Sequence, residues 1–179
     1  LSTNTFSWDE SRTTAGTDYP TFEGDTYRGS TAKCLSCHDG SVAVGDVGWW
    51  NGGPPGVLDN ELILGGFQIG GNGDLSKNHP VAMPIPYQNA PSTYNGVATG
   101  AGIVLAEWKA DPSTSGIRLF NDDGSGNVSA GGVAGMTGIE CSSCHDPHNG
   151  ANVQDKFFLY GELGGDGPDY ICNKCHTKE

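Results

Sequence analysis

Positive charge is scarce in this sequence. Lysine and arginine together number 9, against 21 aspartates and glutamates, which gives a formal net charge of −12 at pH 7. Proteins that bind nucleic acid or anionic membrane surfaces carry clusters of basic side chains. The composition therefore excludes nucleic acid and anionic lipid as expected partners.

Long hydrophobic runs are also lacking. A membrane-spanning helix needs about 18 or more consecutive apolar residues, and the sequence has no such run. Only 35% of the residues are hydrophobic, whereas 29 are glycine and 10 are proline. Such a chain has many turns and little material for an ordinary packed core. Its length of 179 residues predicts a single domain over residues 1–179.

One pentapeptide pattern occurs three times and uses every cysteine. The pattern C-x-x-C-H stands at residues 34–38, 141–145 and 172–176. It is the attachment signature of a c-type haem, in which two thiols form thioethers with the porphyrin and the adjacent histidine binds the iron. The predicted attachment residues are Cys34, Cys37, Cys141, Cys144, Cys172 and Cys175, and the predicted proximal ligands are His38, His145 and His176.

Three covalently attached haem c groups are thus the predicted cofactors. Each porphyrin is a large apolar plate, so three of them can replace the apolar side chains that the sequence lacks. The expected fold class is mostly irregular coil, with a few short helices and strands wrapped around three c-type haems and a haem-packed core.

Zinc sites and disulfides would also explain paired cysteines. Two C-x-x-C pairs can build one four-thiolate zinc site, which leaves the third pair without a role. Zinc also gives no reason for a histidine to follow every second cysteine. A disulfide within C-x-x-C is typical of thioredoxin-like redox proteins, which the sequence does not resemble. Haem attachment accounts for all three motifs at once.

Two histidines remain for the opposite faces of three haems. The chain has five histidines, and only His79 and His148 lie outside the motifs. His148 follows His145 by three residues, which span at most about 10 Å. It therefore cannot reach the far face of its own haem, and the haem at Cys172 and Cys175 is the nearest other one. For His79, reach along the chain excludes neither the first nor the second haem.

One haem then has no second histidine. A thioether ligand from Met83 or Met136 would raise the potential of that haem. A side chain of another type, a ligand from a neighbouring chain, or an open coordination site would equally account for the missing histidine.

Local patterns predict a few short elements. Residues 103–109 are expected to form a strand or short helix, and residues 117–120 a short strand. Residues 121–127 partly match a calcium loop but lack its acidic residue at Leu119 and its closing glutamate. A hairpin-like turn is therefore predicted there.

Four stretches together resemble a known family. These are CLSCHDG (34–40), SKNHPV (76–81), CSSCHDPH (141–148) and CNKCH (172–176). They resemble the extended multihaem cytochromes c of the cytochrome c3-like, doubled C-x-x-C-H class. That class includes secreted cytochromes of metal-reducing bacteria, some of which polymerise into conductive filaments.

The sequence departs from this family at its beginning. The family commonly starts with a further motif of the CxxCHTPH kind, preceded by another histidine, and this sequence has neither. The chain is then either a three-haem variant or one that has lost its beginning. Distal ligands in the family tend to precede the haem that they serve. The resemblance thus implies that His79 serves the haem at His145, that His148 serves the haem at His176, and that the haem at His38 is the one without a histidine partner.

The expected function is electron transfer without chemistry on a substrate. Closely spaced, mostly bis-histidine haems conduct electrons, in this family extracellularly and in some members along a filament. The alternative is a periplasmic enzyme that reduces a small molecule at an open haem at His38. Haem attachment takes place outside the cytoplasmic membrane, so the chain is expected to be exported, to an extracellular or periplasmic location. Its expected partners are other redox proteins, extracellular electron acceptors and further copies of itself in a head-to-tail filament.

Overall fold

The computed structural model describes residues 5–6, 22–23, 27, 29–39, 69, 73–76, 78–125, 127–148 and 158–177. These residues fall into two compact units. The described parts of unit 1 are residues 5–6, 22–23, 27, 32–39, 69, 73–76 and 78–79. The described parts of unit 2 are residues 29–31, 80–125, 127–148 and 158–177. The expectation of a single domain stays a prediction.

Unit 1 contains most of helix α1 (Ser30–His38), which carries the first C-x-x-C-H motif. Ala32 and Leu35 lie three residues apart, on one face of the helix, and both are buried. Lys33 between them is exposed. The Ile69 N–H donates to the His38 carbonyl at 2.7 Å, which satisfies a carbonyl at the end of the helix. Strands β1 (Thr5–Phe6) and β2 (Phe22–Glu23) pair antiparallel in the same unit.

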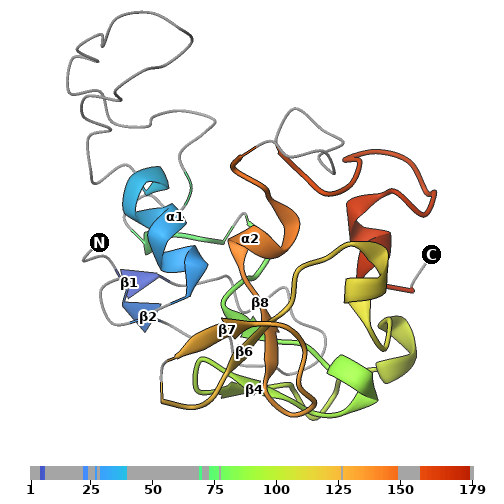
Figure 1. Cartoon of the computed structure of the whole chain (residues 1–179), viewed down its shortest axis with the longest axis horizontal. Helices are drawn as coiled ribbons and strands as arrows, with labels where there is room; N and C mark the ends of the chain where they lie inside the picture. Colours follow the sequence, from blue (N-terminus) through green and yellow to red (C-terminus); the bar gives the residue numbers. More distant parts are fainter. Residues whose placement is uncertain are drawn as a thin grey trace, which may run out of the picture. The chain divides into compact units, whose positions relative to one another are not determined.

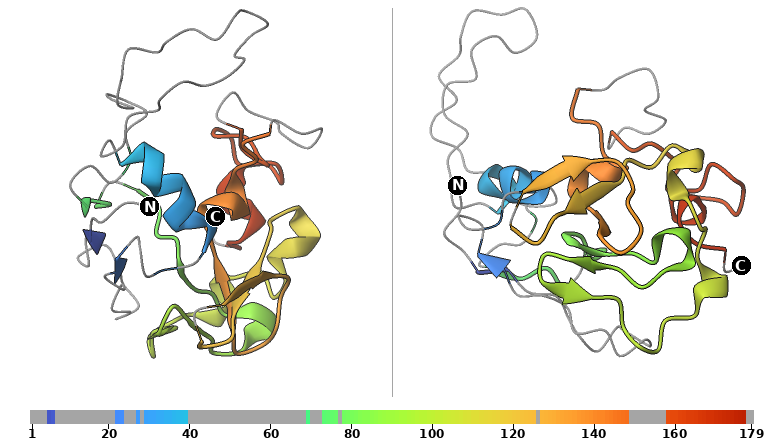
Figure 2. Two further views of the ribbon diagram at one scale, coloured as in Figure 1. Left: turned by 60° about the vertical axis from the view of Figure 1, so that its left-hand side comes forward. Right: turned by 60° about the horizontal axis from the view of Figure 1, so that its bottom comes forward.

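Unit 2 is built around a small antiparallel sheet. Its four strands have the order β3-β8-β6-β7, and a separate hairpin is formed by β4 and β5. The strands are β3 (Met83–Pro84), β4 (Thr93–Tyr94), β5 (Val97–Ala98), β6 (Phe120–Asp122), β7 (Val128–Ala130) and β8 (Thr137–Ile139). Figures 1 and 2 show β6, β7 and β8 side by side, with helix α2 (Cys141–Cys144) at the end of β8.

Short 3-10 helices complete unit 2. They are η4 (Tyr87–Asn89), η5 (Leu105–Glu107), η6 (Pro112–Ser115) and η7 (Ile171–Lys174). Five buried side chains form an apolar cluster beside the sheet: Ile85, Tyr87, Ile117, Leu119 and Ile139. Unit 2 thus has a small core made from its own side chains. In the part of the chain that the structure describes, no helix has both the length and the apolar character to span a bilayer.

The turn predicted at residues 121–127 is confirmed. Strands β6 and β7 pair antiparallel, with Asp122 opposite Val128. The Asp122 carboxylate accepts from the backbone N–H groups of Gly124 and Asn95, and the Asp123 carboxylate accepts from Ser125. These carboxylates close the turn, which is the common role of aspartate at such positions.

The prediction for 117–120 is corrected in part, and the short-helix alternative for 103–109 is confirmed over a shorter range. The strand expected over 117–120 begins only at Phe120, because Ile117 and Leu119 turn into the apolar cluster. The Arg118 N–H donates to the Ser143 carbonyl and not to a neighbouring strand. Within 103–109, the structure has the single 3-10 turn η5.

Replacing Gly138 with alanine is expected to lower the free energy of unfolding by about 1–3 kcal/mol, the usual cost of overpacking a filled site. A Cβ at Gly138 would overlap the Tyr94 ring and lie 2.5 Å from the Met83 carbonyl oxygen. Gly164→Ala is the matched control, because nothing lies within 4 Å of its added Cβ. Chemical denaturation followed by circular dichroism measures both variants. Equal stability of the two would show that β8 has room at Gly138.

Candidate haem-attachment site

The second motif occupies one helical turn directly after β8. Cys141 and Cys144 are the first and last residues of α2, three positions apart, so their thiols share one face of the turn. Glu140 caps this turn: its N–H donates to the Ser143 hydroxyl at 2.9 Å, and its backbone carbonyl accepts from the Ser143 N–H at 2.9 Å. His145 then leaves the helix in an extended conformation, with φ −111° and ψ 140°.

The third motif has the same local design. Cys172 lies in the 3-10 turn η7, Cys175 is its C-cap, and the His176 N–H donates to the Cys172 carbonyl at 2.9 Å. Residues three apart nearly eclipse one another in a 3-10 helix. The two thiols of this motif therefore also lie on one side of a turn.

The first motif lies in helix α1. Cys34 and His38 are both half-buried, and the helical backbone also includes Cys37. The predicted attachment role of the Cys37 side chain lies outside the described residues. In all three motifs the structure thus places the first cysteine on a helical turn.

The second histidine is held in place by a short antiparallel bridge. His145 pairs with Leu159. The Asp146 N–H donates to the Phe158 carbonyl at 2.7 Å, and the Tyr160 N–H donates to the Cys144 carbonyl at 2.9 Å. These two bonds flank His145, so the polypeptide fixes its backbone on both sides.

The third histidine is held by a bridge of the same kind. His176 pairs with Trp108. The Lys109 N–H donates to the Cys175 carbonyl at 2.8 Å, and the Thr177 N–H donates to the Glu107 carbonyl at 3.0 Å. A segment distant in sequence therefore orients this predicted iron ligand.

The second and third motifs lie close together in unit 2. Cys144 and Cys175 both pack against the apolar cluster. Burial and, to a lesser extent, the nearby Cys172 raise the pKa of Cys144 to about 11. Burial and, to a lesser extent, Cys144 and Cys172 raise the pKa of Cys175 to about 12, although the Lys109 ammonium opposes the shift. Thiols of the two motifs are therefore near enough for their charges to repel.

These pKa values predict slow alkylation of the folded chain before haem attachment. At pH 8, a thiol with a pKa of about 11 has a thiolate fraction roughly 100-fold lower than one at the ordinary value of 9.0, and the thiolate is the reactive form. Iodoacetamide is expected to modify Cys144 and Cys175 at least about 100-fold more slowly in the folded than in the urea-unfolded chain. The exposed Cys172 should react first. Peptide mass spectrometry measures each rate. Alkylation at equal rates in the folded and unfolded chain would contradict the burial of these thiols.

The same pKa shifts have a defined effect on stability. The pKa values of Cys144 and Cys175 in the folded chain lie above the ordinary value of 9.0. The protonated thiols therefore favour folding fully below pH 9, and this contribution is lost as the pH rises toward 11 and 12.

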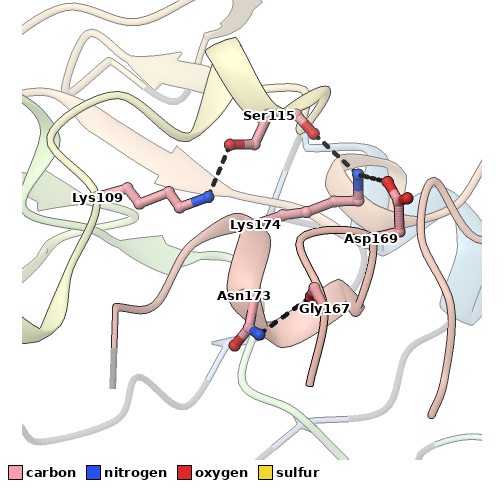
Figure 3. A network of polar contacts seen from close by, with 6 residues as sticks. All are labelled: Lys109, Ser115, Gly167, Asp169, Asn173 and Lys174. Carbon is pink, nitrogen blue, oxygen red and sulfur yellow. Dashed lines mark hydrogen bonds and ion pairs between the residues drawn. The ribbon is translucent and has the colours of Figure 1, made fainter. Parts of the chain in front are cut away.

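Lys174 anchors the third motif to η6, and Lys109 binds the same serine (Figure 3). The Lys174 ammonium donates to the Ser115 carbonyl at 3.2 Å and lies 3.8 Å from an oxygen of Asp169. The Lys109 ammonium donates to the Ser115 hydroxyl at 3.0 Å. Lys174 stands between the two cysteines of the motif and is itself buried. Because a buried ammonium requires polar partners, these contacts fix the position of η7.

Asp146 organises the region after the second motif. Its carboxylate lies 3.7 Å from the Arg118 guanidinium and accepts from the His148 N–H at 3.0 Å. Its Oδ1 also lies 3.5 Å from the His148 Nδ1. Arg118 in turn lies 5.0 Å from the centre of the Tyr160 ring.

Tyr160 has a buried hydroxyl with no hydrogen-bond partner in the described residues. Burial raises its pKa, the Arg118 guanidinium lowers it, and the Asp146 carboxylate raises it.

The distal candidates lie in different units. His79 is an exposed residue of unit 1, whereas the His148 side chain in unit 2 is 91% exposed. Met83 packs against the apolar cluster, and Met136 is half-buried in the turn before β8. The ligand roles of these four residues stay predictions.

The residues of the second and third motifs fit c-type haem. Their cysteines are paired on single turns, and their histidines are held by the backbone. Cys144, Cys172 and Cys175 carry free thiols and not disulfides. Across the described ranges, no three His, Cys, Asp or Glu side chains gather around one point as a metal site requires.

Comparison of the chain with protein-family models, with curated proteins and with solved structures gave no match.

Two residues of the site, Glu140 and Trp108, belong to no motif that the sequence analysis identified. Glu140 had a weak signal, because it stands three positions before a serine, the spacing of a helix cap and its partner. Trp108 had none, since its partner His176 lies far along the chain.

Proposed function

We propose that this protein is an exported three-haem c-type cytochrome that carries electrons and is not an enzyme. The observation that carries the proposal is the use of every cysteine in three C-x-x-C-H motifs. This is the attachment pattern of c-type haem, and neither zinc binding nor a disulfide requires a histidine after each pair. The short distance between the second and third motifs supports it, because electron transfer needs neighbouring redox centres to lie close together.

Haem iron, when bound, supplies a one-electron couple whose potential depends on its axial ligands and surroundings. The chain supplies everything else. Cys141 with Cys144, and Cys172 with Cys175, lie on single turns and would hold the porphyrins. The backbone bridges orient His145 and His176, and His79 and His148 are the proposed distal ligands.

The stoichiometry of haem tests this function. The purified, denatured chain should retain three haems, seen as a mass increase of three haem groups over the polypeptide and as the pyridine haemochrome absorption of c-type haem. Cys172→Ser combined with Cys175→Ser should reduce the count by one. A chain that carries no haem, or that carries zinc, would exclude the proposal.

The alternative function is reduction of a small molecule at an open haem at His38. Carbon monoxide added to the reduced protein tests whether the open haem that the enzyme requires is present, because it binds only haems with an open or weakly held position. Turnover of nitrite or peroxide that disappears in His38→Ala would favour the enzyme. Electron exchange with other redox proteins, without consumption of nitrite or peroxide, would favour the electron carrier.

We further propose that copies of the chain associate head to tail, as the resemblance to filament-forming cytochromes implies. A heterologous contact of this kind continues into an open filament unless a rotation closes it. Electron micrographs of concentrated haem-loaded protein should show filaments. Discrete monomers at every concentration would contradict the assembly but not the electron transfer.

A further inference from the structure

We propose that Trp108 is a positioning residue for His176 and sets the plane of the imidazole at the third motif. The inference rests on the proposed function, because that plane matters only if the ring binds iron. The Trp108 and His176 rings have centroids 4.4 Å apart and planes inclined by 54°. This distance is just below the range of about 4.5–7 Å for favourable aromatic pairs, so the two rings are in close contact.

The backbone explains why the two rings meet. The hydrogen bonds from Lys109 to Cys175 and from Thr177 to Glu107 lie on either side of the Trp108–His176 pair. The pair itself is therefore of the non-hydrogen-bonded kind, in which facing Cα atoms approach to about 4.5 Å and the side chains lie on the same side. The Thr177 hydroxyl adds a bond to the Ala106 carbonyl. The segment around Trp108 thus holds the histidine segment at several successive positions.

The indole is itself fixed. Trp108 is half-buried and packs against the apolar cluster of unit 2. Lys109, the next residue, is tied to Ser115 through its ammonium. The indole is thus fixed both by the pairing of its backbone and by its packing against the apolar cluster. A side chain fixed in this way can orient a neighbouring ring, as residues in contact with metal-binding histidines commonly do.

The second motif supplies an internal comparison. His145 has the same pattern of backbone bonds, but its opposite residue is Leu159 and not an aromatic. A leucine restricts the volume available to the ring and offers no preferred inclination. An aromatic pair is expected to favour one ring orientation by about 2- to 13-fold. The imidazole at the third motif should therefore have one orientation, held more narrowly than that at the second.

The test compares Trp108→Phe and Trp108→Leu in the full haem-loaded chain. Phenylalanine keeps a ring against His176, whereas leucine keeps apolar volume alone. Val104→Ala, at a 53% exposed residue of the same segment, is the control. Haem count is measured by mass spectrometry, imidazole orientation by the low-spin ferric EPR spectrum, and the ring contact by nuclear Overhauser effects between Trp108 and His176 in the reduced protein.

We expect Trp108→Leu to retain every haem. In its low-spin ferric EPR spectrum, the narrow signal of one haem should broaden, and the signals of the other haems should be unchanged. Trp108→Phe and Val104→Ala should keep that signal. An unchanged spectrum in Trp108→Leu, a wild-type protein without the Overhauser contact, or equal losses in the phenylalanine and leucine variants would each overturn the inference. Failure of the proposed function is separate, because it would appear as missing haem in the wild-type chain.

Discussion

Replacing Glu140 with alanine is expected to lower the free energy of unfolding by about 2–5 kcal/mol, since each buried donor left without its acceptor costs about 1–3 kcal/mol. The side chain is fully buried, with 0% of its surface exposed. One carboxylate oxygen accepts from the Tyr94 hydroxyl at 2.6 Å and the other from the Thr31 N–H at 2.7 Å. Alanine removes the acceptor that both donors use.

Two further variants give this prediction a scale. Glu140→Gln keeps one acceptor oxygen and turns the other position into a donor, so about 1–2 kcal/mol should be lost. Glu162→Ala removes an exposed glutamate of the same unit and should change stability by less than about 0.5 kcal/mol. Denaturant unfolding of the haem-loaded chain, followed by far-ultraviolet circular dichroism, measures all three. A Glu140→Ala midpoint equal to that of Glu162→Ala would refute the role given to this carboxylate.

Glu140 matters because of what it holds. It caps the turn of Cys141 and Cys144. It also accepts from the N–H of Thr31 and from the Tyr94 hydroxyl, both in the same compact unit. One buried side chain therefore joins the turn of the second motif to two distant segments of unit 2.

Part of the fold could be predicted from the sequence. The turn at 121–127 was predictable because Asp, Asn and Gly carry their own local hydrogen-bonding and conformational preferences. The strand at 117–120 was displaced because Ile117 and Leu119 pack into a cluster whose other members lie far along the chain. Tertiary packing of this kind overrides short local patterns.

The candidate site could likewise be predicted only in part from the sequence. The cysteine and histidine spacing was visible because haem attachment is a local chemical pattern. The bridges at His145 and His176 were not, since they join segments that are separated along the chain. The Glu140 network also joins distant residues, Thr31 and Tyr94. Non-local hydrogen bonds leave little trace in a single sequence, and these are the contacts that orient the proposed ligands.

His148→Ala is expected to leave three haems attached and to convert one of them from six- to five-coordinate. The affected haem should be that at Cys172 and Cys175, because three residues cannot carry His148 to the far face of its own haem. The side chain is 91% exposed and is therefore free to approach a haem iron. Its Nδ1 lies 3.5 Å from the Asp146 carboxylate, which leaves Nε2 for iron. A histidine that binds a metal commonly directs its other nitrogen to such a carboxylate.

Carbon monoxide titration of the reduced protein measures the change. His148→Ala should bind one more carbon monoxide per chain than the wild type, and its ferric spectrum should gain a high-spin component. His79→Ala should open a different haem, so the double variant should bind two more. Asp146→Asn keeps the ligand but weakens its orientation, and should shift the potential of one haem without opening it. An unchanged low-spin spectrum in His148→Ala would show that this residue is not a ligand, and the third haem would then need another partner for the iron opposite His176.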